Sequence, residues 1–426
     1  MDLRNWEQAK SKTNHYKRRR PEETELYRLV FHNHDRLEQE WELRFQSTYG
    51  YLREEVNETL QSYLDCGLIV NGAARIECQN KDCAHSTLLA FSCKKRGLCP
   101  SCAGKRAVIF AEHLNSNILK PLSYRHMVFS IPKILRPYFK FNRKHLDLLF
   151  KASWDTIRNM FNEILPDGNP GAILALHTAG DSLNFNPHIH GLVTNGVLGE
   201  NSIFYPLPDF KSSKFTEYFA HRLLTLMKRA ELVPDSRIEL IESWQHSGFS
   251  VWAGEPIDYS EQESILFISR YIDKGPVANS KISIDGDIIT YETKDGKTHE
   301  FYPLEFLARI TPHIPNKWES TTRYYGLYSH RKRGKEKRVN ESLGIRIEEL
   351  PLEAQRQVSK SWAALIKKVY EVDPLICPRC GEKMKIRELL KESREIEKVA
   401  EHFSIPTFAR PPPLLDPTDL FPIQAA

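Results

Sequence analysis

Apolar residues recur at helical spacing in three long segments of the chain. Residues 23–45 and 51–67 carry them at i, i+3 and i+4 with charged residues between, which predicts two amphipathic helices. Residues 144–165 show the same pattern and end before Pro166, a residue that stops helices. The polar and apolar positions therefore predict a helical N-terminal part and a further helix in the centre.

Short apolar runs bounded by turn residues predict strands in the central part of the chain. These runs are residues 126–132, 171–180, 188–196 and 248–257. The second and third runs are separated only by DSLNFNP, so we expect them to pair as antiparallel neighbours. Residues 281–302 contain two Asp-Gly turns between alternating segments, which predicts a three-stranded meander.

One more helix is expected between these groups of strands. Tyr259 to Asp273 carries apolar residues at helical spacing, and we expect Ser260 to be its N-cap with Glu263 at the third helical position. This helix would carry Tyr271 near its end.

Composition is that of a globular protein: 426 residues, 41% hydrophobic and 27% charged, enough for two or three packed domains. A net charge of +5 is weak support for nucleic-acid binding, but Lys17 to Arg20 and residues 330–338 are dense basic runs. Either run alone is also explained as a solvated tail or linker. The N-terminus lacks a signal peptide and no run has the ~18 apolar residues of a membrane span, so we expect a cytoplasmic protein.

Eight cysteines in a chain without a secretion signal favour metal binding or buried thiols over disulfides. A knuckle of two cysteines is followed by a CPSC turn, a pattern typical of a zinc ribbon in which thiolates surround one ion at about 2.3 Å. The predicted zinc ligands are Cys78, Cys83, Cys99 and Cys102. Cys66, Cys93 and His85 remain alternative ligands.

A further knuckle, Cys377-Pro-Arg-Cys380, stands near the C-terminus and supplies half of a tetrahedral site. Cys66 and Cys93 would complete it if the C-terminal segment folded back on the N-terminal module. Eight cysteines would then form two zinc sites. The alternative is that Cys66 and Cys93 are core residues.

Two histidines, His188 and His190, stand on either side of Ile189 in a predicted strand. Because successive side chains of a strand point to opposite faces, we expect that a strong twist or a bulge beside Pro187 brings both rings to one metal ion. A packed histidine pair is the alternative. The metal interpretation gains weight from RYIDK, where a helix end is expected to place Tyr271 and Lys274 on one face.

The pairing of His-hydrophobic-His with Tyr-x-x-Lys resembles the HUH endonuclease superfamily, which includes rolling-circle replication initiators, relaxases and transposases. An ordered set of further motifs narrows the resemblance: SCKKRGLCPSC, LHTAGDSLNFNPHIHGLV, GFSVW, SRYIDKGP, EFLARITPHIP, RYYGLYSHR and DPLICPRCG. In this order they resemble the rolling-circle insertion-sequence transposases with a zinc-binding N-terminus and their common-region relatives. The resemblance covers residues 49–384, and its specificity lies in the ordered set.

This resemblance implies a metal-dependent tyrosine DNA transesterase. Tyr271 would attack a phosphodiester in one DNA strand, leaving a free 3′-OH and a 5′-phosphotyrosine. Because a phenol is a poor nucleophile at neutral pH, Lys274 is expected to favour the phenolate or to bind the scissile phosphate. His188 and His190 would hold Mg²⁺ or Mn²⁺, which would polarise a phosphate oxygen.

Two imidazoles alone hold Mg²⁺ poorly, since this ion prefers oxygen ligands. Asp181, in the loop after the preceding strand, is the expected third ligand, and His177 is the less favoured one. Some family members carry a second tyrosine four residues before the first, but that position is Phe267 here. A single-tyrosine enzyme would need a second protomer, or reuse of Tyr271, to process both element ends.

The expected fold class is α+β: a helical and zinc-ribbon N-terminal module, an HUH-type antiparallel sheet flanked by helices, and a small C-terminal zinc-knuckle region. We expect a helical arm over 1–65, a zinc-binding DNA-recognition module over 66–110, and the HUH nuclease domain over 120–276. A β-meander and basic DNA-binding region would follow over 277–345. Residues 346–426 would form a helical zinc-knuckle region and a proline-rich tail.

The expected partners are single-stranded element ends and target DNA, with a homo-oligomer compatible with the scheme and no membrane association. The expected DNA contacts are Arg96, Arg106, Arg331 and Arg333. Such phosphate contacts would make affinity fall with salt. The location would be the bacterial cytoplasm, at the nucleoid. Two alternatives stay open: a plasmid replication initiator or relaxase with the same chemistry, and a non-catalytic zinc-dependent DNA-binding regulator.

Overall fold

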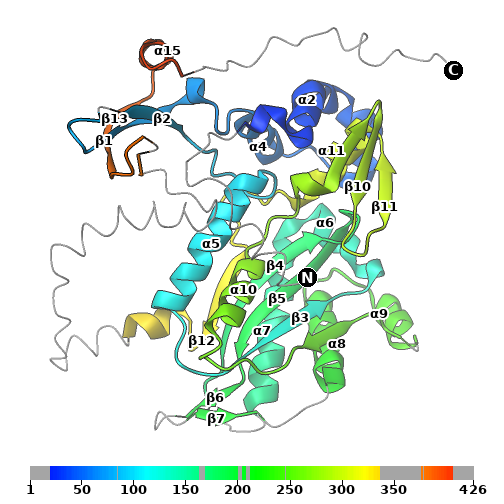
Figure 1. Cartoon of the computed structure of the whole chain (residues 1–426). Coiled ribbons are helices and arrows are strands. Elements are labelled where there is room, and N and C mark those ends of the chain that lie inside the picture. Colours follow the sequence, from blue (N-terminus) through cyan, green and yellow to red (C-terminus); the bar gives the residue numbers. More distant parts are fainter. Residues whose placement is uncertain are drawn as a thin grey trace.

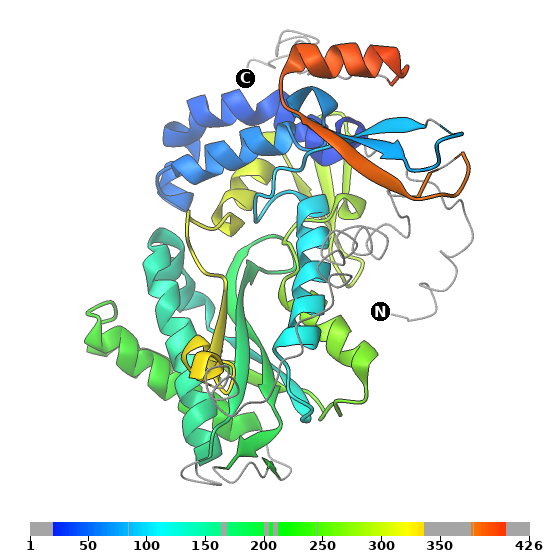
Figure 2. The ribbon, with the colours of Figure 1, turned by 90° about the vertical axis from the view of Figure 1, so that its left-hand side faces the viewer.

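The computed structural model describes residues 20–83, 85–162, 168–199, 204–207, 212–244, 246–335, 376–377 and 379–405. These residues form an α+β structure in which a helical and cysteine-rich part joins an antiparallel sheet flanked by helices, so the predicted fold class is confirmed (Figures 1 and 2). The basic residues 17–19 and 336–338 and the proline-rich tail lie outside the described residues.

The largest sheet has five strands in the order β12-β4-β5-β3-β8, and every neighbouring pair is antiparallel. Its strands are β3 (Tyr124–Ser130), β4 (Gly171–Ala179), β5 (Phe185–Thr194), β8 (Ser250–Ala253) and β12 (Thr322–Gly326). The predicted pairing of residues 171–180 with 188–196 is confirmed as β4 and β5. Because side chains alternate between the two faces, each strand supplies two separate cores.

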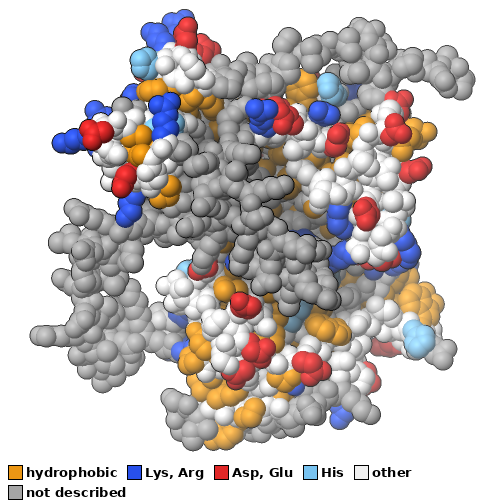
Figure 3. Space-filling view, viewed as in Figure 1, with side chains coloured by type: hydrophobic (Ala, Val, Ile, Leu, Met, Phe, Trp, Pro, Cys, Tyr) orange, Lys and Arg blue, Asp and Glu red, His pale blue; other side chains and the backbone are white. Residues whose placement is uncertain are grey.

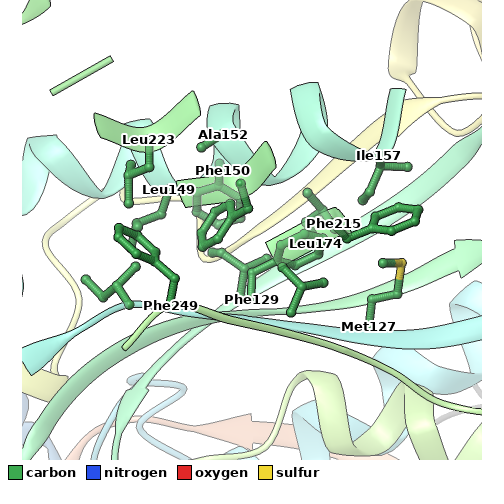
Figure 4. Packing of buried hydrophobic residues seen from close by; sticks show 14 of the residues in the cluster. Met127, Phe129, Leu149, Phe150, Ala152, Ile157, Leu174, Phe215, Leu223 and Phe249 are labelled. Carbon is green, nitrogen blue, oxygen red and sulfur yellow. The ribbon is translucent and has the colours of Figure 1, made fainter. Parts of the chain in front are cut away.

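One face of this sheet is covered by four helices. They are α6 (Arg136–Phe141), α7 (Leu146–Asn162), α8 (Ser212–Arg229) and α9 (Asp235–Glu242). Figure 4 shows Phe129 and Leu174 of the sheet among aromatic residues of the helices, including Phe150 and Phe215. This large apolar core holds the sheet in a fixed shape, which a site on the opposite face requires.

The opposite face is covered by α5 (Pro100–Asn117) and α10 (Gln262–Ile272), which pack against each other (Figure 1). Ile265 and Ile272 of α10 lie seven positions apart and contact Ile173 and Leu192 of the sheet. The predicted N-cap of this helix was wrong, because the helix begins at Gln262 and Ser260 instead donates its hydroxyl to Asp258.

The N-terminal helices and the meander share one core. The elements are α2 (Glu25–Arg44), α3 (Gln46–Tyr49), α4 (Glu54–Leu64), β9 (Ile282–Asp285), β10 (Ile288–Glu292), β11 (Thr298–Phe301) and α11 (Pro303–Ile310). The Thr24 side chain caps α2 by accepting from the Tyr27 amide, and the three-stranded meander is confirmed. Described residues of two segments that were predicted to be separate, α2 to α4 on one side and β9 to α11 on the other, thus pack together.

A smaller sheet has three strands in the order β13-β1-β2, so it pairs a strand near the C-terminus with two strands that precede α5. It contains β1 (Ala73–Cys78), β2 (Ser86–Ala90) and β13 (Met384–Leu390), followed by α15 (Ser393–His402). Figure 1 shows this sheet and α15 at one end of the molecule. A short ribbon of β6 (Gly196–Leu198) and β7 (Phe204–Pro206) completes the strands described here. None of the helices within the described residues has the length and apolar character needed to cross a membrane.

Candidate active site

Three histidines meet on the face of the large sheet that α5 and α10 cover. The β4–β5 register places His177 directly opposite His188, and Ala175 opposite His190. Directly opposite residues of an antiparallel pair share a face, and so do residues two apart on one strand. One ring nitrogen from each of the three histidines therefore lies within 4.8 Å of the others.

The expectation that His188 and His190 need a twist or bulge beside Pro187 was wrong. Ile189 separates the two histidines, so they are two positions apart and regular alternation already directs both to one face. Ile189 itself is buried in the core on the other face. The irregular pairing between β4 and β5 lies instead between His177 and Ala179.

The third member of the group is His177, which corrects the prediction of Asp181. Asp181 follows β4 in the turn closed by a hydrogen bond from the Gly180 amide to the Asn184 carbonyl, 2.9 Å long. Its carboxylate lines the same cleft, but it does not join the three imidazoles. The β4–β5 register explains the difference. It pairs His177 with His188, whereas Asp181 lies in the turn beyond the paired residues.

Each histidine of the group has one ring nitrogen already in a hydrogen bond. His177 Nε2 lies 2.8 Å from the Ile272 carbonyl, and His188 Nδ1 lies 2.6 Å from the Asn186 carbonyl, so each N–H donates to a main-chain oxygen. His190 Nδ1 lies 2.9 Å from His126 Nε2. The second nitrogen of each ring remains for a metal ion, and such partners orient metal-binding imidazoles.

Burial keeps these imidazoles uncharged at neutral pH. It lowers the pKa of His177 to about 3 and also lowers the pKa values of His188 and His190, and the neighbouring imidazoles lower the pKa of His190 further. A neutral imidazole has the free lone pair that a cation requires. The donor set therefore fits a divalent metal ion.

His126, on β3, is a site residue that the sequence analysis missed. Beyond its contact with His190, its ring makes an edge contact with Tyr271 at 6.0 Å between centroids, and burial lowers its pKa to about 4. The available signal was a histidine at the start of the predicted strand of residues 126–132. No second motif residue stands beside it, so spacing alone does not mark His126 as a site residue.

Tyr271 lies in the last turn of α10, directly over the histidine group. Its ring centroid is 5.2 Å from that of His190 and 5.8 Å from that of His177. The structure thus brings Tyr271 to His188 and His190, although the tyrosine is distant from both histidines in the sequence. Packing of the α10 apolar residues on the sheet positions the phenol.

The lysine at the phenol oxygen is Lys294 and not Lys274. Lys294 Nζ lies 3.1 Å from Tyr271 Oη, and it stands in the turn between β10 and β11. Lys274 follows the end of α10 at Ile272, and its Nζ lies 5.8 Å from the centroid of the Tyr271 ring. Burial and the nearby charge of Lys294 lower the pKa of Lys274.

These residues open into a cleft of about 610 Å³ whose charged lining residues are mostly basic. Its basic residues are Arg96, Arg106, Arg136, Arg143, Lys274, Lys281, Lys294 and Lys297. Three acidic residues, Asp181, Asp273 and Asp295, also line it. On the face shown in Figure 3, by contrast, acidic and basic side chains are interspersed over the described surface. A polyanion is therefore the ligand whose charge suits the cleft.

The arginines of the cleft differ in their partners. Arg106 Nε donates to Asp273 Oδ2 at 2.8 Å, and Arg96 donates to the Glu319 carbonyl at 2.7 Å. Arg143 pairs with the Glu319 carboxylate. The buried Nε of Arg136 has no hydrogen-bond partner among the described residues, and burial lowers the pKa of its guanidinium.

Two of the four arginines predicted to contact DNA lie away from the cleft. Arg333 donates to the Tyr328 carbonyl at 3.0 Å and lies over the Tyr324 ring, while Arg331 is exposed. Only Arg96 and Arg106 of the predicted set line the cleft.

The eight cysteines form two groups of four, but the grouping differs from the prediction. We call the first the α5 cysteine site, made of Cys66, Cys93, Cys99 and Cys102, and the second the terminal cysteine site, made of Cys78, Cys83, Cys377 and Cys380. The β1–β2 hairpin causes the difference, because β1 carries Cys78 away from Cys66 and β2 returns the chain to Cys93. His85 belongs to neither group.

The α5 cysteine site has the spacing of a tetrahedral thiolate centre. Cys66 Sγ lies 3.7 Å from Cys99 Sγ and 3.6 Å from Cys102 Sγ, and Cys93 Sγ lies 3.5 Å from Cys102 Sγ. Four sulfurs at about 2.3 Å from one zinc ion stand about 3.8 Å apart. All eight cysteines are free thiols, so the four-sulfur set fits zinc.

Two family models match the chain. Residues 171–336, which hold the three histidines and Tyr271, match the family described as "Putative transposase", and residues 37–131 match the "Transposase zinc-binding domain". The protein is thus a transposase that contains a zinc-binding domain. It belongs to the insertion-sequence transposases of the IS91 and IS801 kind.

Two curated proteins illustrate the relationship. The chain is 28% identical over 358 residues to the "Transposase for insertion sequence element IS801" of Pseudomonas savastanoi pv. phaseolicola, covering 79% of this chain and 84% of that protein. It is 22% identical over 330 residues to "Putative transposase y4qJ" of Sinorhizobium fredii, covering 70% of this chain and 81% of that protein. No solved structure matches the chain.

Proposed function

We propose that this transposase cuts and rejoins single-stranded DNA at the ends of its element through a 5′-phosphotyrosine on Tyr271. The proposal rests on the position of the Tyr271 ring, 5.2 Å from the His190 ring, in a cleft lined by cations. Of the two tyrosines that line the cleft, Tyr291 is only 4% exposed, which favours Tyr271 as the nucleophile.

The reaction is a transesterification that conserves the number of phosphoester bonds. Tyr271 Oη attacks the phosphorus, the Oη–P bond forms, and the bond from phosphorus to the 3′ oxygen breaks. The phenol loses its proton and the departing 3′ oxygen gains one. The reverse step lets a 3′-OH reseal a strand, so neither water nor ATP is consumed.

His177, His188 and His190 would hold the divalent ion of this reaction. When bound, the ion would neutralise charge on a non-bridging phosphate oxygen. Of Mg²⁺ and Mn²⁺, Mn²⁺ is the better fit, because Mg²⁺ prefers oxygen ligands and a transition ion accepts imidazole nitrogen.

Lys294 is the cation best placed to assist the nucleophile. Its Nζ donates a hydrogen bond to Tyr271 Oη, so the ammonium group would orient this oxygen for attack. Arg136 lines the cleft with an unpartnered buried Nε–H, which suits a phosphate oxygen. Lys274, at the ring face, would contact the DNA backbone beside the scissile phosphate.

The absence of a second tyrosine on α10 limits each protomer to one covalent link at a time. The side chain four residues before Tyr271 is Phe267, which is 58% exposed. Processing two ends would require either two protomers or release of the first strand before Tyr271 acts again.

A covalent trapping assay tests the proposal. The full-length protein is incubated with single-stranded DNA from an element end and Mn²⁺, and the products are separated under denaturing conditions. We expect a protein–DNA adduct that Tyr271→Phe abolishes and that Tyr302→Phe, at a tyrosine outside the cleft, leaves intact. An adduct that persists in Tyr271→Phe would refute the assignment.

A further inference from the structure

The terminal cysteine site links the C-terminal segment to the beginning of the chain. Cys78 Sγ lies 3.6 Å from Cys380 Sγ, and Cys83 Sγ lies 3.5 Å from Cys377 Sγ. All four sulfurs lie within 4.8 Å of one another, and none is in a disulfide. These separations match the edge of about 3.8 Å expected for four thiolates around one zinc ion.

Backbone hydrogen bonds shape both turns of this site. The Cys83 amide donates to the Asn80 carbonyl at 3.2 Å, and the Gly381 amide donates to the Cys377 carbonyl at 2.9 Å. Gly381 has φ +75°, a conformation that favours glycine after the second cysteine of a knuckle. A backbone hydrogen bond of 2.7 Å from the Gln79 amide to the Lys383 carbonyl joins the two turns.

The strands beside the site bring these two turns together. β13 pairs antiparallel with β1, and the register sets Met384 opposite Cys78, so each knuckle lies just beyond the same end of the strand pair. At the other end, Ile396 and Ala400 of α15 pack on Ile69 and Leu390. Residues 376–405 thus add an outer strand and a helix to the zinc-binding domain.

The apolar core around the site is too small to hold this segment well. The core beside the cysteines consists of Ile76, Cys377 and Met384, and the five residues between the ends of β13 are exposed. Small modules of this kind usually depend on a metal, and structural zinc supplies folding energy directly. Four thiolates also exclude Mg²⁺ and Ca²⁺, which take oxygen ligands.

We infer that the terminal cysteine site binds a second structural zinc ion, which fastens residues 376–405 to β1. The match to the zinc-binding domain ends at residue 131, so Cys377 and Cys380 are ligands from outside it. The functional zinc-binding domain is therefore discontinuous, built from both ends of the chain. This inference is independent of the DNA chemistry proposed for Tyr271.

Metal analysis of the full-length protein tests the site. A His188→Ala background removes a contribution from the histidine group. We expect about two equivalents of zinc in this background and about one after Cys377→Ser with Cys380→Ser. Cys380→His, which keeps a ligand atom, should retain the second ion. Arg75→Gln, which removes the ion pair with Glu388 between β1 and β13, is the matched control and should keep both ions.

A second measurement tests the fastening role. A specific protease site is inserted between residues 335 and 376, and the cut protein is captured by a C-terminal tag. We expect residues 376–405 to retain the rest of the chain while zinc is bound and to separate from it in the Cys377→Ser, Cys380→Ser variant. Retention in that variant would overturn the fastening role. An unchanged zinc content would overturn the site itself, and iron in place of zinc would overturn its assignment to zinc.

Discussion

Lys294 Nζ and Tyr271 Oη lie 3.1 Å apart, although one belongs to a hairpin turn and the other to the last turn of α10. The meander that carries Lys294 packs on the N-terminal helices, while α10 packs on the large sheet. The contact therefore joins the core of the N-terminal helices and meander to the core beneath α10, at the nucleophile. The relative placement of these cores sets the environment of the phenol oxygen.

Replacing Lys294 with Met should slow formation of the covalent adduct by about 10- to 100-fold, since a hydrogen bond to a charged group contributes about 1.5–3 kcal/mol. Single-turnover rates with end-derived DNA measure the effect. Lys228→Met is the control, because Lys228 lies on α8 outside the cleft and pairs with Asp235. A larger loss in Lys274→Met than in Lys294→Met would contradict this assignment.

Substitution of His177 should weaken metal binding far more than substitution of Asp181. His177→Ala removes one of three grouped ligands, whereas Asp181→Ala removes a carboxylate that lies outside the group. We expect the Mn²⁺ dissociation constant, measured by titration calorimetry, to rise at least about tenfold in the first variant. Equal losses in both variants would instead make Asp181 a ligand.

The choice of ion is a separate prediction. Because the grouped ligands are three imidazoles, adduct formation should be faster with Mn²⁺ than with Mg²⁺ at equal concentrations. Rates measured across a concentration series for each ion separate weak binding from slow reaction. A preference for Mg²⁺ at every concentration would show that oxygen ligands dominate the site.

The ion pair between Arg106 and Asp273 connects the zinc-binding domain with the nucleophile. Arg106 lies on α5, whose first turn contains Cys102 and is preceded by Cys99 of the α5 cysteine site, and Asp273 follows the last residue of α10. Burial raises the pKa of Asp273, and the charge of Arg106 opposes this shift. We expect Arg106→Met to lower the free energy of unfolding by about 1–3 kcal/mol and to slow adduct formation.

Denaturant unfolding and adduct rates measure these two effects. Arg106→Lys should restore part of both. If Arg106→Met alters only DNA affinity, the residue acts as a phosphate contact and not as a link between the two parts.

His313 should make the stability of the protein depend on pH. Burial lowers its pKa to about 4, whereas an unfolded histidine titrates near ~6.5. Between the native pKa of about 4 and the unfolded pKa of ~6.5, the unfolded chain binds a proton that the native chain does not. The free energy of unfolding is therefore highest above pH ~6.5 and falls as the pH decreases through this range. His313→Gln should reduce this pH-dependent loss in the free energy of unfolding by up to about 3 kcal/mol.

The measurement is denaturant unfolding across that pH window. Gln is chosen because its amide can replace the donation from His313 Nε2 to the Leu183 carbonyl, 2.9 Å long. Parallel pH profiles for the two proteins would exclude this role for His313.

Local patterns predicted the helices α2, α4, α7 and α10 and the strands β3, β4, β5, β8 and the meander, but not which residues face each other across the sheet. Alternation in residues 171–180 and 188–196 defines β4 and β5. The register between them depends on the turn from Gly180 to Asn184, and a shift of one residue would move His177 to the other face. The sequence therefore indicated His188 and His190, but it favoured Asp181 over His177 as their third partner.

Long-range packing explains the remaining differences. Cysteine spacing predicts each knuckle, because Cys99 and Cys102 are local neighbours, but it does not tell which knuckles meet across the β1–β2 hairpin. Lys294 reaches Tyr271 only because the meander packs on helices near the N-terminus. No short sequence pattern indicates such a long-range contact.

The large sheet has one of its outer strands, β12, supplied by residues 322–326, which follow the histidines and Tyr271 along the chain. During translation, β4 lacks this neighbour until residue 326 has left the ribosome. A gene copy interrupted before that codon would yield a protein with an unpaired sheet edge, which promotes aggregation. Damaged copies of the element would thus produce insoluble fragments in place of stray nucleases.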